Sequence, residues 1–307
     1  MGTPDIAVPA LRALNEAGHN LAAVVTQPDR PAGRGRKMKR CPVAEEAVEL
    51  GLKVWQPERV GAAVRDLISL QADAACVMAF GQLLPAELIS AFPLGCINVH
   101  TSLLPELRGA APINWAIVQG KKRTGVTTML MDQGLDTGDI LLQQATEIDQ
   151  QETAGSLADR LARMGAKLLV RTLDELRAGK ISPRPQAEAG ASYARRLTKS
   201  DGLVDWQRPA PEVDLLVRGL DPWPTAHTVL DGKALRLFGP TALVDILPPV
   251  QPGTLIKPLP GHEDLLWVAC GRGALGVGQV QAAGKRRMAA TDFLRGAHLA
   301  PGSLLGG

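Results

Sequence analysis

The stretch Gly95-Cys96-Ile97-Asn98-Val99-His100-Thr101-Ser102-Leu103-Leu104-Pro105 decides how the first half of the chain is interpreted. It begins as a short apolar run typical of a buried strand and ends in a polar turn. Because side chains alternate along a strand, Asn98 and His100 are expected to point to the same face. An amide that donates, beside an imidazole that can donate or carry charge, suits a carbonyl oxygen that becomes an oxyanion.

A carboxylate that could complete this pair follows in Leu135-Asp136-Thr137-Gly138-Asp139. Asp136 would keep the imidazole of His100 in its charged form. Each residue also has an ordinary explanation, since a single His or Asn at a strand end is usually a core or turn residue, and this Asp-containing stretch alone is a common turn. His100 and the loop after Met131 both follow strand ends, which allows them to meet beyond the carboxyl edge of a sheet.

Short apolar runs alternate with amphipathic stretches through the first 150 residues. This alternation predicts an α/β domain, a Rossmann-like parallel sheet covered by helices on both faces, although no Gly-x-Gly-x-x-Gly loop is present. The expected strands are 20–25, 52–55, 74–79, 96–100 and 126–131, and the expected helices are 7–17, 42–50, 60–70, 85–92, 110–119 and 155–179.

The pattern changes near residue 181. Residues 181–191 carry two prolines and no periodicity, which is typical of a linker. A helix expected at 212–219 is followed by evenly spaced short strands, which suggest a small β-barrel. We therefore expect a first domain at 1–180, a linker at 181–199 and a second domain at 200–307. The strands expected in the second domain are 225–230, 234–238, 253–256, 265–270 and 276–281.

Composition excludes several classes of protein. The 307 residues are 45% apolar and 21% charged, which is ordinary for a globular chain and favours two domains. The formal charge is only +3, so contact with a polyanion must come from local clusters of cations. Four widely spaced cysteines argue against a zinc site or a disulfide framework. With no signal peptide and no apolar run of membrane-spanning length, we expect a cytoplasmic protein without a membrane partner.

The order and spacing of Asn98, His100, residues 102–105, residues 108–112 and Asp136 resemble the folate-dependent formyltransferases. Within that family the resemblance is to the enzymes that formylate methionine carried on initiator tRNA, a step of translation initiation. It implies transfer of a formyl group from 10-formyltetrahydrofolate, the co-substrate, to the α-amino group of methionyl-tRNA. It also implies that Asn98, His100 and Asp136 are catalytic, that no metal takes part, and that the second domain is OB-like and binds tRNA. We expect a monomer.

The resemblance further implies a folate site made of the segment after strand 74–79 and the turn after His100. Neither segment carries the charges expected of a phosphate site, which is consistent with a flat heterocycle held by backbone groups in an apolar slot. We expect Thr127 to line this site; the alternative is that its hydroxyl only satisfies a local backbone group. The folate-binding residues implied are Met78, Phe80, Gly81, Leu83, Ser102, Leu103, Leu104 and Pro105.

A basic segment lies between a strand and a helix, with six cations between Arg30 and Arg40. Such a charge run is usually a solvated loop. This one is longer than the few residues common in strand-to-helix loops, and it could contact phosphates and 2′-hydroxyls of an RNA acceptor stem. The resemblance implies that Arg34 occupies the position whose side chain, in the family, enters the acceptor arm of the tRNA. The expected tRNA contacts in this loop are Arg30, Arg34, Arg36 and Lys37. In the second domain they are Lys285 and Arg286, for which a solvated turn is an equally good explanation.

Residues 1–5 resemble the loop that follows the first strand in the family. That strand would be central in the sheet, and its loss would leave neighbouring backbone groups unpaired. Either the true start lies upstream or the fold is compromised, and we expect an omitted upstream segment because the remainder keeps every motif.

Two other functions stay open. Another folate formyltransferase or hydrolase, acting on a nucleotide-linked amine or on water, would share Asn98, His100 and Asp136 but would not need the basic loop or the second domain. A non-catalytic RNA-binding protein built on a decayed enzyme is disfavoured because all three of these residues are retained.

Overall fold

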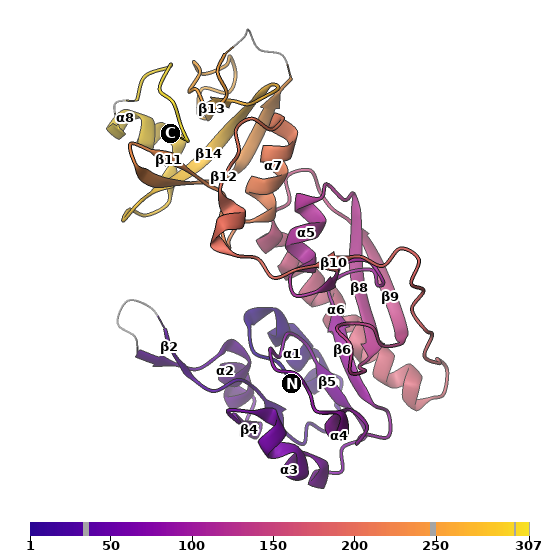
Figure 1. Ribbon diagram of the computed structural model, residues 1–307. Helices are drawn as coiled ribbons and strands as arrows, with labels where there is room; N and C mark the ends of the chain where they lie inside the picture. The colour runs from indigo at the N-terminus through magenta and orange to yellow at the C-terminus, as the bar shows by residue number, and fades with distance from the viewer. Residues whose placement is uncertain (33–36, 246–249, 298, 307) are drawn as a thin grey trace. The chain divides into compact units, whose positions relative to one another are not determined.

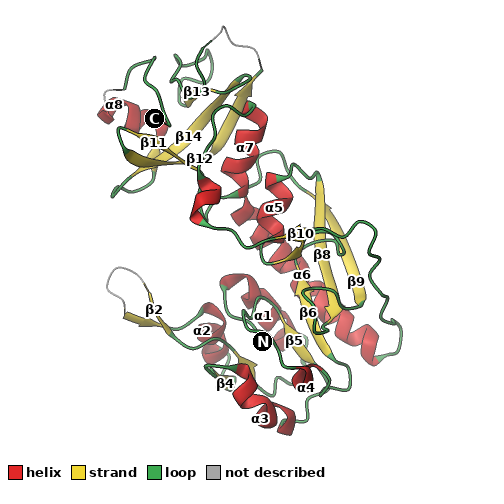
Figure 2. Cartoon of the chain, viewed as in Figure 1, coloured by secondary structure: helices red, strands yellow, loops and turns green. Residues whose placement is uncertain are grey.

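The computed structural model describes residues 1–32, 37–245, 250–297 and 299–306. The chain folds into two compact units, whose elements are labelled in Figure 1 and coloured by type in Figure 2. No helix within the described residues is long and apolar enough to cross a bilayer. The first unit comprises Met1–Pro112, Thr124–Glu147 and Ala158–Ala194, and the second comprises Ile113–Arg123, Ile148–Leu157 and Arg195–Gly307.

The first unit is built on short parallel strands. β1 (Val24–Val25) pairs in parallel with β4 (Val54–Trp55), and β5 (Ala75–Val77) pairs in parallel with β6 (Cys96–His100). Because β5 and β6 run in the same direction, the loops that follow them leave the sheet at the same edge. The predicted mixed α/β architecture with a parallel sheet is confirmed, although three of these strands are shorter than the apolar runs suggested.

Met1 and Gly2 lie between β1 and β5. The Gly2 N–H donates to the carbonyl of Val25 at 3.1 Å, and the Met78 N–H donates to the carbonyl of Met1 at 2.9 Å. A cavity of about 150 Å³ adjoins this position, and apolar side chains such as Leu14 line much of it. The expected upstream strand stays a prediction.

The sheet continues beyond β6 with strands of the opposite sense. β8 (Arg123–Leu130) pairs antiparallel with β6, and β9 (Ile140–Glu147) pairs with β8. Leu130 therefore lies opposite Ile97, at the start of β6 rather than at its end. The expectation that the loop after Met131 leaves the same sheet edge as His100 is wrong, because it assumed that all strands are parallel. The loop after Met131 must therefore turn back along β6 to reach His100.

Helices cover both faces of this sheet. Ile97 and Val99 pack in one apolar core with side chains of α1, α2 and α6, whereas Cys96 packs in a second core with α3 and α4. Asn98 and His100, by alternation, share the face of Cys96. The helices of this unit, with α5 and α6 continuing into the second, are η1 (Asp5–Ala7), α1 (Val8–Glu16), α2 (Pro42–Glu49), η2 (Val60–Ala63), α3 (Val64–Ser69), α4 (Ala86–Ile89), α5 (Pro112–Val118) and α6 (Ala154–Arg177).

Two small ribbons complete the first unit. β2 (Arg30–Ala32) and β3 (Lys37–Lys39) form an antiparallel hairpin within the basic segment, which Figure 1 shows as a separate ribbon before α2. β10 (Tyr193–Ala194) pairs in parallel with β7 (Arg108–Gly109). The second pairing ties the end of the segment that follows α6 to residues near His100.

The second unit is β-rich. An antiparallel sheet has the order β11 (His227–Leu230), β12 (Lys233–Val244), β14 (Ala274–Ala282), β13 (Leu266–Ala269), with β15 (Met288–Ala289) also on β14. Its core joins strand residues to side chains of the helices α7 and α8. The β-rich second domain is confirmed in these coarse terms. Its helices are η3 (Lys199–Gly202), α7 (Ala210–Gly219) and α8 (Ala290–Ala297).

Shorter pairings extend this sheet. Leu255 bridges to Val268 of β13, and Thr254 bridges to Leu304. The Gly306 N–H donates to the carbonyl of Val229, in β11, at 2.8 Å. Residues 253–256, expected as a strand, make these isolated bridges instead of a regular ladder.

We expect the folding stability of the second unit to depend on pH through Asp201. Arg195 donates to its carboxylate at 3.0 Å, and the Thr198 N–H and hydroxyl donate at 2.6 and 2.8 Å in a capping box. The Arg195 hydrogen bond, followed by those of Thr198, holds the pKa of Asp201 well below its ordinary value. A carboxylate with a depressed folded-state pKa stabilises the fold above its unfolded pKa, and that contribution is lost as the pH falls.

Asp201→Asn should therefore lower the urea midpoint of unfolding at pH 7, and the difference from wild type should shrink as the pH falls below about 4. Glu212→Gln is the matched control, because Glu212 forms an exposed pair with Arg208. A gap between wild type and Asp201→Asn that stays constant down to pH 2 would contradict the assignment.

Candidate active site

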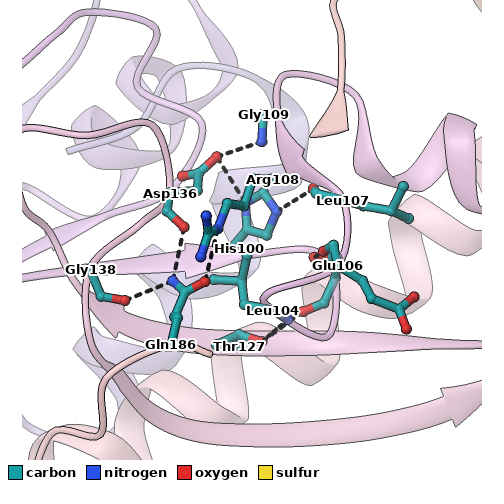
Figure 3. Close-up of polar contacts among 11 residues, drawn as sticks. His100, Leu104, Glu106, Leu107, Arg108, Gly109, Thr127, Asp136, Gly138 and Gln186 are labelled. Atoms are coloured by element: carbon teal, nitrogen blue, oxygen red, sulfur yellow. Dashed lines mark hydrogen bonds and ion pairs between the residues drawn. The ribbon is translucent and has the colours of Figure 1, made fainter. Parts of the chain in front are cut away.

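His100 ends β6 and is 5% exposed, with both ring nitrogens near oxygen atoms. Its Nε2 lies 2.9 Å from the carbonyl oxygen of Leu107, and its Nδ1 lies 3.6 Å from Oδ2 of Asp136, as Figure 3 shows. A carbonyl only accepts, so Nε2 carries a hydrogen. A second hydrogen on Nδ1 would make the ring an imidazolium paired with the carboxylate. The structure therefore brings together His100 and Asp136, as predicted from the sequence.

Asn98 lies two residues before His100 on β6 and is partly exposed. Its neighbours across the ladder are Val77 and Met129. Within the described residues its side-chain amide forms no hydrogen bond, so it is available as a donor to a ligand. The site thus combines a free amide, a buried imidazole and a carboxylate.

The loop that carries Asp136 is tightly constructed. The Asp132 carboxylate accepts a hydrogen bond from the Thr137 hydroxyl at 2.8 Å. Asp136 has a φ of 55°, and its Oδ2 accepts the Gly109 N–H at 2.8 Å. Gly138 passes so close to the last carbonyl of β8 that a Cβ would lie 1.8 Å from that oxygen. This close approach lets the loop turn back from the start of β6 toward His100.

Two residues of this site were not predicted from the sequence. Gln186 donates to the carbonyls of Asp136 and Gly138 at 2.9 and 2.7 Å and accepts from Nε of Arg108 at 3.0 Å. Arg108 is 1% exposed. It belongs to the stretch that carried the family resemblance but had no role assigned. Gln186 lies in the irregular segment at 181–191, where no periodicity could indicate an inward-pointing side chain.

Thr127 holds the turn after His100. Its hydroxyl donates to the Ser102 carbonyl at 2.7 Å, and it accepts the Leu104 N–H at 3.2 Å and Nε2 of Gln143 at 3.0 Å. Thr127 is fully buried. Of the two roles expected for Thr127, the hydrogen bonds are those of a residue that satisfies local backbone groups.

We expect Thr127→Val to lower the free energy of unfolding by about 2 kcal/mol or more. The substitution leaves the buried groups that bond to the Thr127 hydroxyl without a hydrogen-bond partner. Thr124→Val is a matched control on the same strand. The Thr124 hydroxyl is buried but has no hydrogen-bond partner in the part of the chain that the structure describes, so its replacement should be neutral or stabilising. Urea unfolding of both variants measures the difference, and equal losses would contradict the role of the Thr127 hydroxyl.

The residues implied to bind folate lie in two loops at the common edge of β5 and β6. Met78 and Phe80 bury their side chains in the two cores, whereas Leu83 is 91% exposed. Their contribution to a ligand site would come from backbone groups and from Leu83. Of the implied residues in the turn after His100, Ser102 and Leu104 are buried.

Side chains fix the loop after β5. The Thr3 hydroxyl donates to the Phe80 carbonyl at 3.0 Å, and Gln27 Nε2 donates to the Gly81 carbonyl at 2.9 Å. In the described chain no hydrogen bond engages the backbone N–H groups of Gly81 and Leu83. Remaining members of the implied folate set, in the other loop, are Leu103 and Pro105.

The predicted tRNA contacts are placed only in part. Arg30 starts β2, where it is exposed and donates to Oε1 of Gln27 at 3.3 Å. Lys37 begins β3, while Arg34 and Arg36 lie outside the described residues. Two further cations are exposed in the turn between β14 and β15, Lys285 and Arg286.

The cysteine of β6 lacks the lowered pKa of a nucleophilic thiol. Burial raises the pKa of Cys96 to about 11, so it is a neutral thiol near pH 7. No group of three or more His, Cys, Asp or Glu side chains in the described ranges is arranged to hold a metal ion.

Comparison with known proteins relates both units to one family. The family described as "Formyl transferase" matches residues 1–173, and "Formyl transferase, C-terminal domain" matches residues 196–298. Among curated relatives, "Methionyl-tRNA formyltransferase" of Lachnospira eligens is 48% identical over all of this chain and 98% of its own length. The protein of the same name from Pelobacter propionicus is 50% identical over all of this chain and 95% of its own length.

Solved structures with lower identity share the fold. An N-formyltransferase from Helicobacter canadensis, in complex with folinic acid and dTDP-3-aminofucose, has a TM-score of 0.64 at 16% identity and covers 92% of this chain and 97% of its own. HypX from Aquifex aeolicus, in complex with tetrahydrofolic acid, has a TM-score of 0.61 at 18% identity and covers 81% of this chain and 43% of its own. From the two family matches and the full-length relatives it follows that this chain belongs to the formyl transferase family and groups with its methionyl-tRNA formyltransferases.

Proposed function

We propose that this protein transfers the formyl group of 10-formyltetrahydrofolate to the α-amino group of methionyl-tRNA. The observation that carries the proposal is the pairing of buried His100 with half-buried Asp136 on the strand face of a free Asn98, in a chain related over its full length to enzymes of that name. A formyl acceptor amine needs no protein nucleophile, because the neutral amine attacks the formyl carbon directly. Esterification of the methionine lowers the basicity of its amine, so a useful fraction is neutral near pH 7.

The side chains act on the oxyanion and the protons of this reaction. Asn98 donates its amide N–H to the oxygen that gains charge, and His100 donates a ring N–H. Both ring nitrogens of His100 already face oxygen atoms, so substrate must take over one of these contacts. Asp136 orients the ring, stabilises the imidazolium and relays the proton lost by the attacking amine toward the departing folate nitrogen.

The folate co-substrate would bind at the common edge of β5 and β6. Support comes from the backbone N–H groups of Gly81 and Leu83, which are free of internal partners within the described residues, and from the apolar character of the turn at 102–105. This proposal keeps Met78, Phe80, Gly81, Leu83 and Ser102 to Pro105 as the folate-binding residues.

The tRNA would bind through the basic hairpin and the second domain. We propose the division into a catalytic domain at 1–180, a linker at 181–199 and a tRNA-binding domain at 200–307. An OB-like barrel is supported by the contacts that connect β13 through Leu255 and Thr254 to Leu304, and from Gly306 to β11. A register shift, such as that between Phe238 and Thr241, favours a bend in a strand, which would suit β12 in a barrel. A monomeric state and a cytoplasmic location stay predictions.

Formylation by the purified full-length chain tests the proposal. The protein is incubated with 10-formyltetrahydrofolate and initiator tRNA charged with methionine, and formylmethionine is measured after deacylation. Formation of formylmethionyl-tRNA that requires both substrates supports the proposal. Release of formate without tRNA would indicate a hydrolase, formylation of an amino sugar nucleotide in preference to tRNA would indicate a sugar enzyme, and tRNA binding without turnover would indicate a decayed enzyme.

A further inference from the structure

Gln186 connects the two segments that position Asp136. Figure 3 shows its side chain between the main chain of Asp136 and Gly138 on one side and Arg108 on the other. Its amide nitrogen donates to both carbonyls, at 2.9 and 2.7 Å, and its amide oxygen accepts from Arg108 at 3.0 Å. Both N–H donors and the acceptor of one glutamine are thus engaged, which is most of its hydrogen-bonding capacity.

These hydrogen bonds fix the direction of the Asp136 carboxylate. Asp136 adopts a φ of 55°, a left-handed conformation that few non-glycine residues use. The Asp136 carbonyl belongs to the peptide unit that directly follows Asp136, and the Gly138 carbonyl lies two peptide units further along the same loop. A donor that holds both carbonyls therefore also holds the carboxylate, whose Oδ2 lies 3.6 Å from Nδ1 of His100.

Arg108, which donates to the amide oxygen of Gln186, is also linked to the Asp136 carboxylate. Arg108 precedes Gly109, whose N–H donates to Oδ2 of Asp136 at 2.8 Å. Arg108 is 1% exposed, yet its Nη2 makes no hydrogen bond within the described residues and lies 3.5 Å from the exposed carboxylate of Glu188. A buried guanidinium with so few partners stabilises a fold poorly. Its placement is better explained by what it positions.

We infer that Gln186 is a positioning residue for formyl transfer, which holds Asp136 against His100 through two main-chain carbonyls and through Arg108. This inference rests on the function proposed for the site. It makes a residue of the segment 181–191 a working part of the active site, acting through its contacts with Asp136, Gly138 and Arg108. Gln186 acts on the rate through Asp136 alone.

Two substitutions separate the donors of Gln186 from its acceptor. Gln186→Leu removes both with little change in volume, whereas Gln186→Glu keeps an oxygen for Arg108 but loses the N–H donors and puts negative charge beside two carbonyls. Both should lower kcat by about 10- to 100-fold, the effect of a small misplacement of a reacting group, with both KM values within about 3-fold of wild type. Full activity in Gln186→Leu would overturn the inference, because the enzyme would then need neither the donors nor the acceptor of Gln186.

A double-mutant cycle with Asp136→Asn tests the route of the effect. Single-turnover rates with excess enzyme keep the slow variants measurable. If Gln186 acts through Asp136, Gln186→Leu should slow the Asp136→Asn enzyme by less than about 2-fold, since the group it positions is already lost. Equal losses in the two backgrounds would overturn the inference while leaving the proposed function intact. A wild type that formylates no methionyl-tRNA would instead contradict the proposed function.

Arg184→Ala is the control from the same segment. The Arg184 side chain is exposed, and its main chain pairs with Ile140 at 2.8 and 2.9 Å, which the substitution keeps. We expect an unchanged kcat. A merely structural role for Gln186 would appear as a lower Tm and raised KM values in Gln186→Leu with kcat preserved, and that result would also overturn the inference.

Discussion

His100→Ala should lower the turnover number for formylation by about 10²- to 10⁴-fold, the range for loss of an oxyanion donor or a general acid. The reason is geometric: the ring ends β6, is buried, and holds one nitrogen toward the Asp136 carboxylate. The substitution removes an interaction made mainly in the transition state, so the dissociation constant for the folate should change far less. Steady-state kinetics and equilibrium binding of a folate analogue measure the two effects.

Asn98→Ala and Asp136→Ala should also lower the turnover number by about 10²- to 10⁴-fold, because these side chains and His100 act on one oxyanion and one proton path. Controls of the same residue types lie outside the site: His19→Ala after α1 and Asp66→Asn on α3 should leave kcat unchanged. Near-normal turnover in His100→Ala would refute the catalytic assignment. Equal losses of turnover in the controls would show that the assay reports folding instead of chemistry.

The strand that carries the site was predictable because its sequence is unambiguous. Residues 96–100 are bounded by a glycine and a polar turn, and β6 spans those same residues. The run at 20–25 is equally apolar, but only Val24 and Val25 pair, with β4. An apolar run indicates burial, whereas the length of a ladder depends on the partner strand, which a single sequence does not specify.

The direction of β8 could not be read from its pattern. A strand, a helix and a second strand in succession normally give a right-handed parallel crossover. Here β8 runs antiparallel to β6, and the loop that carries Asp136 starts at the opposite end of β6 from His100. The loop reaches the imidazole because Gly138 passes close to the end of β8 and Gln186 holds its carbonyls. Both are tertiary facts with no periodic signal.

β9 was missed for a related reason. Only its first residues are apolar and buried, and from Gln143 onward its side chains are mostly polar and are exposed or half-buried. Alternation of polarity cannot indicate a strand with so few inward positions. Gln143 nevertheless contributes to the site, because it donates to Thr127 and to the Leu104 carbonyl.

Neutralising the cations of the basic segment between Arg30 and Arg40 should weaken tRNA binding most at low salt. If Arg30, Arg34, Arg36 and Lys37 each contact a phosphate, their replacement by glutamine should reduce the slope of log Kd against log salt by about 3 to 4 units, at slightly under one unit for each contact. The double variant Arg59→Gln/Arg65→Gln, which removes exposed cations elsewhere on the first unit, should leave the slope unchanged. Filter binding of charged initiator tRNA across salt concentrations measures both.

Arg34→Lys separates a specific contact from a diffuse one. Lysine keeps the positive charge but lacks the planar fork that can bind two acceptors or stack on a base. A specific role for Arg34 predicts weaker binding with nearly the same salt slope, because the number of neutralised phosphates is kept. Binding equal to wild type would assign the loop a purely electrostatic role. If the loop-neutral variant also keeps the wild-type slope, the loop is not a phosphate-binding element, and the exposed Lys285 and Arg286 of the second unit become the cations to test.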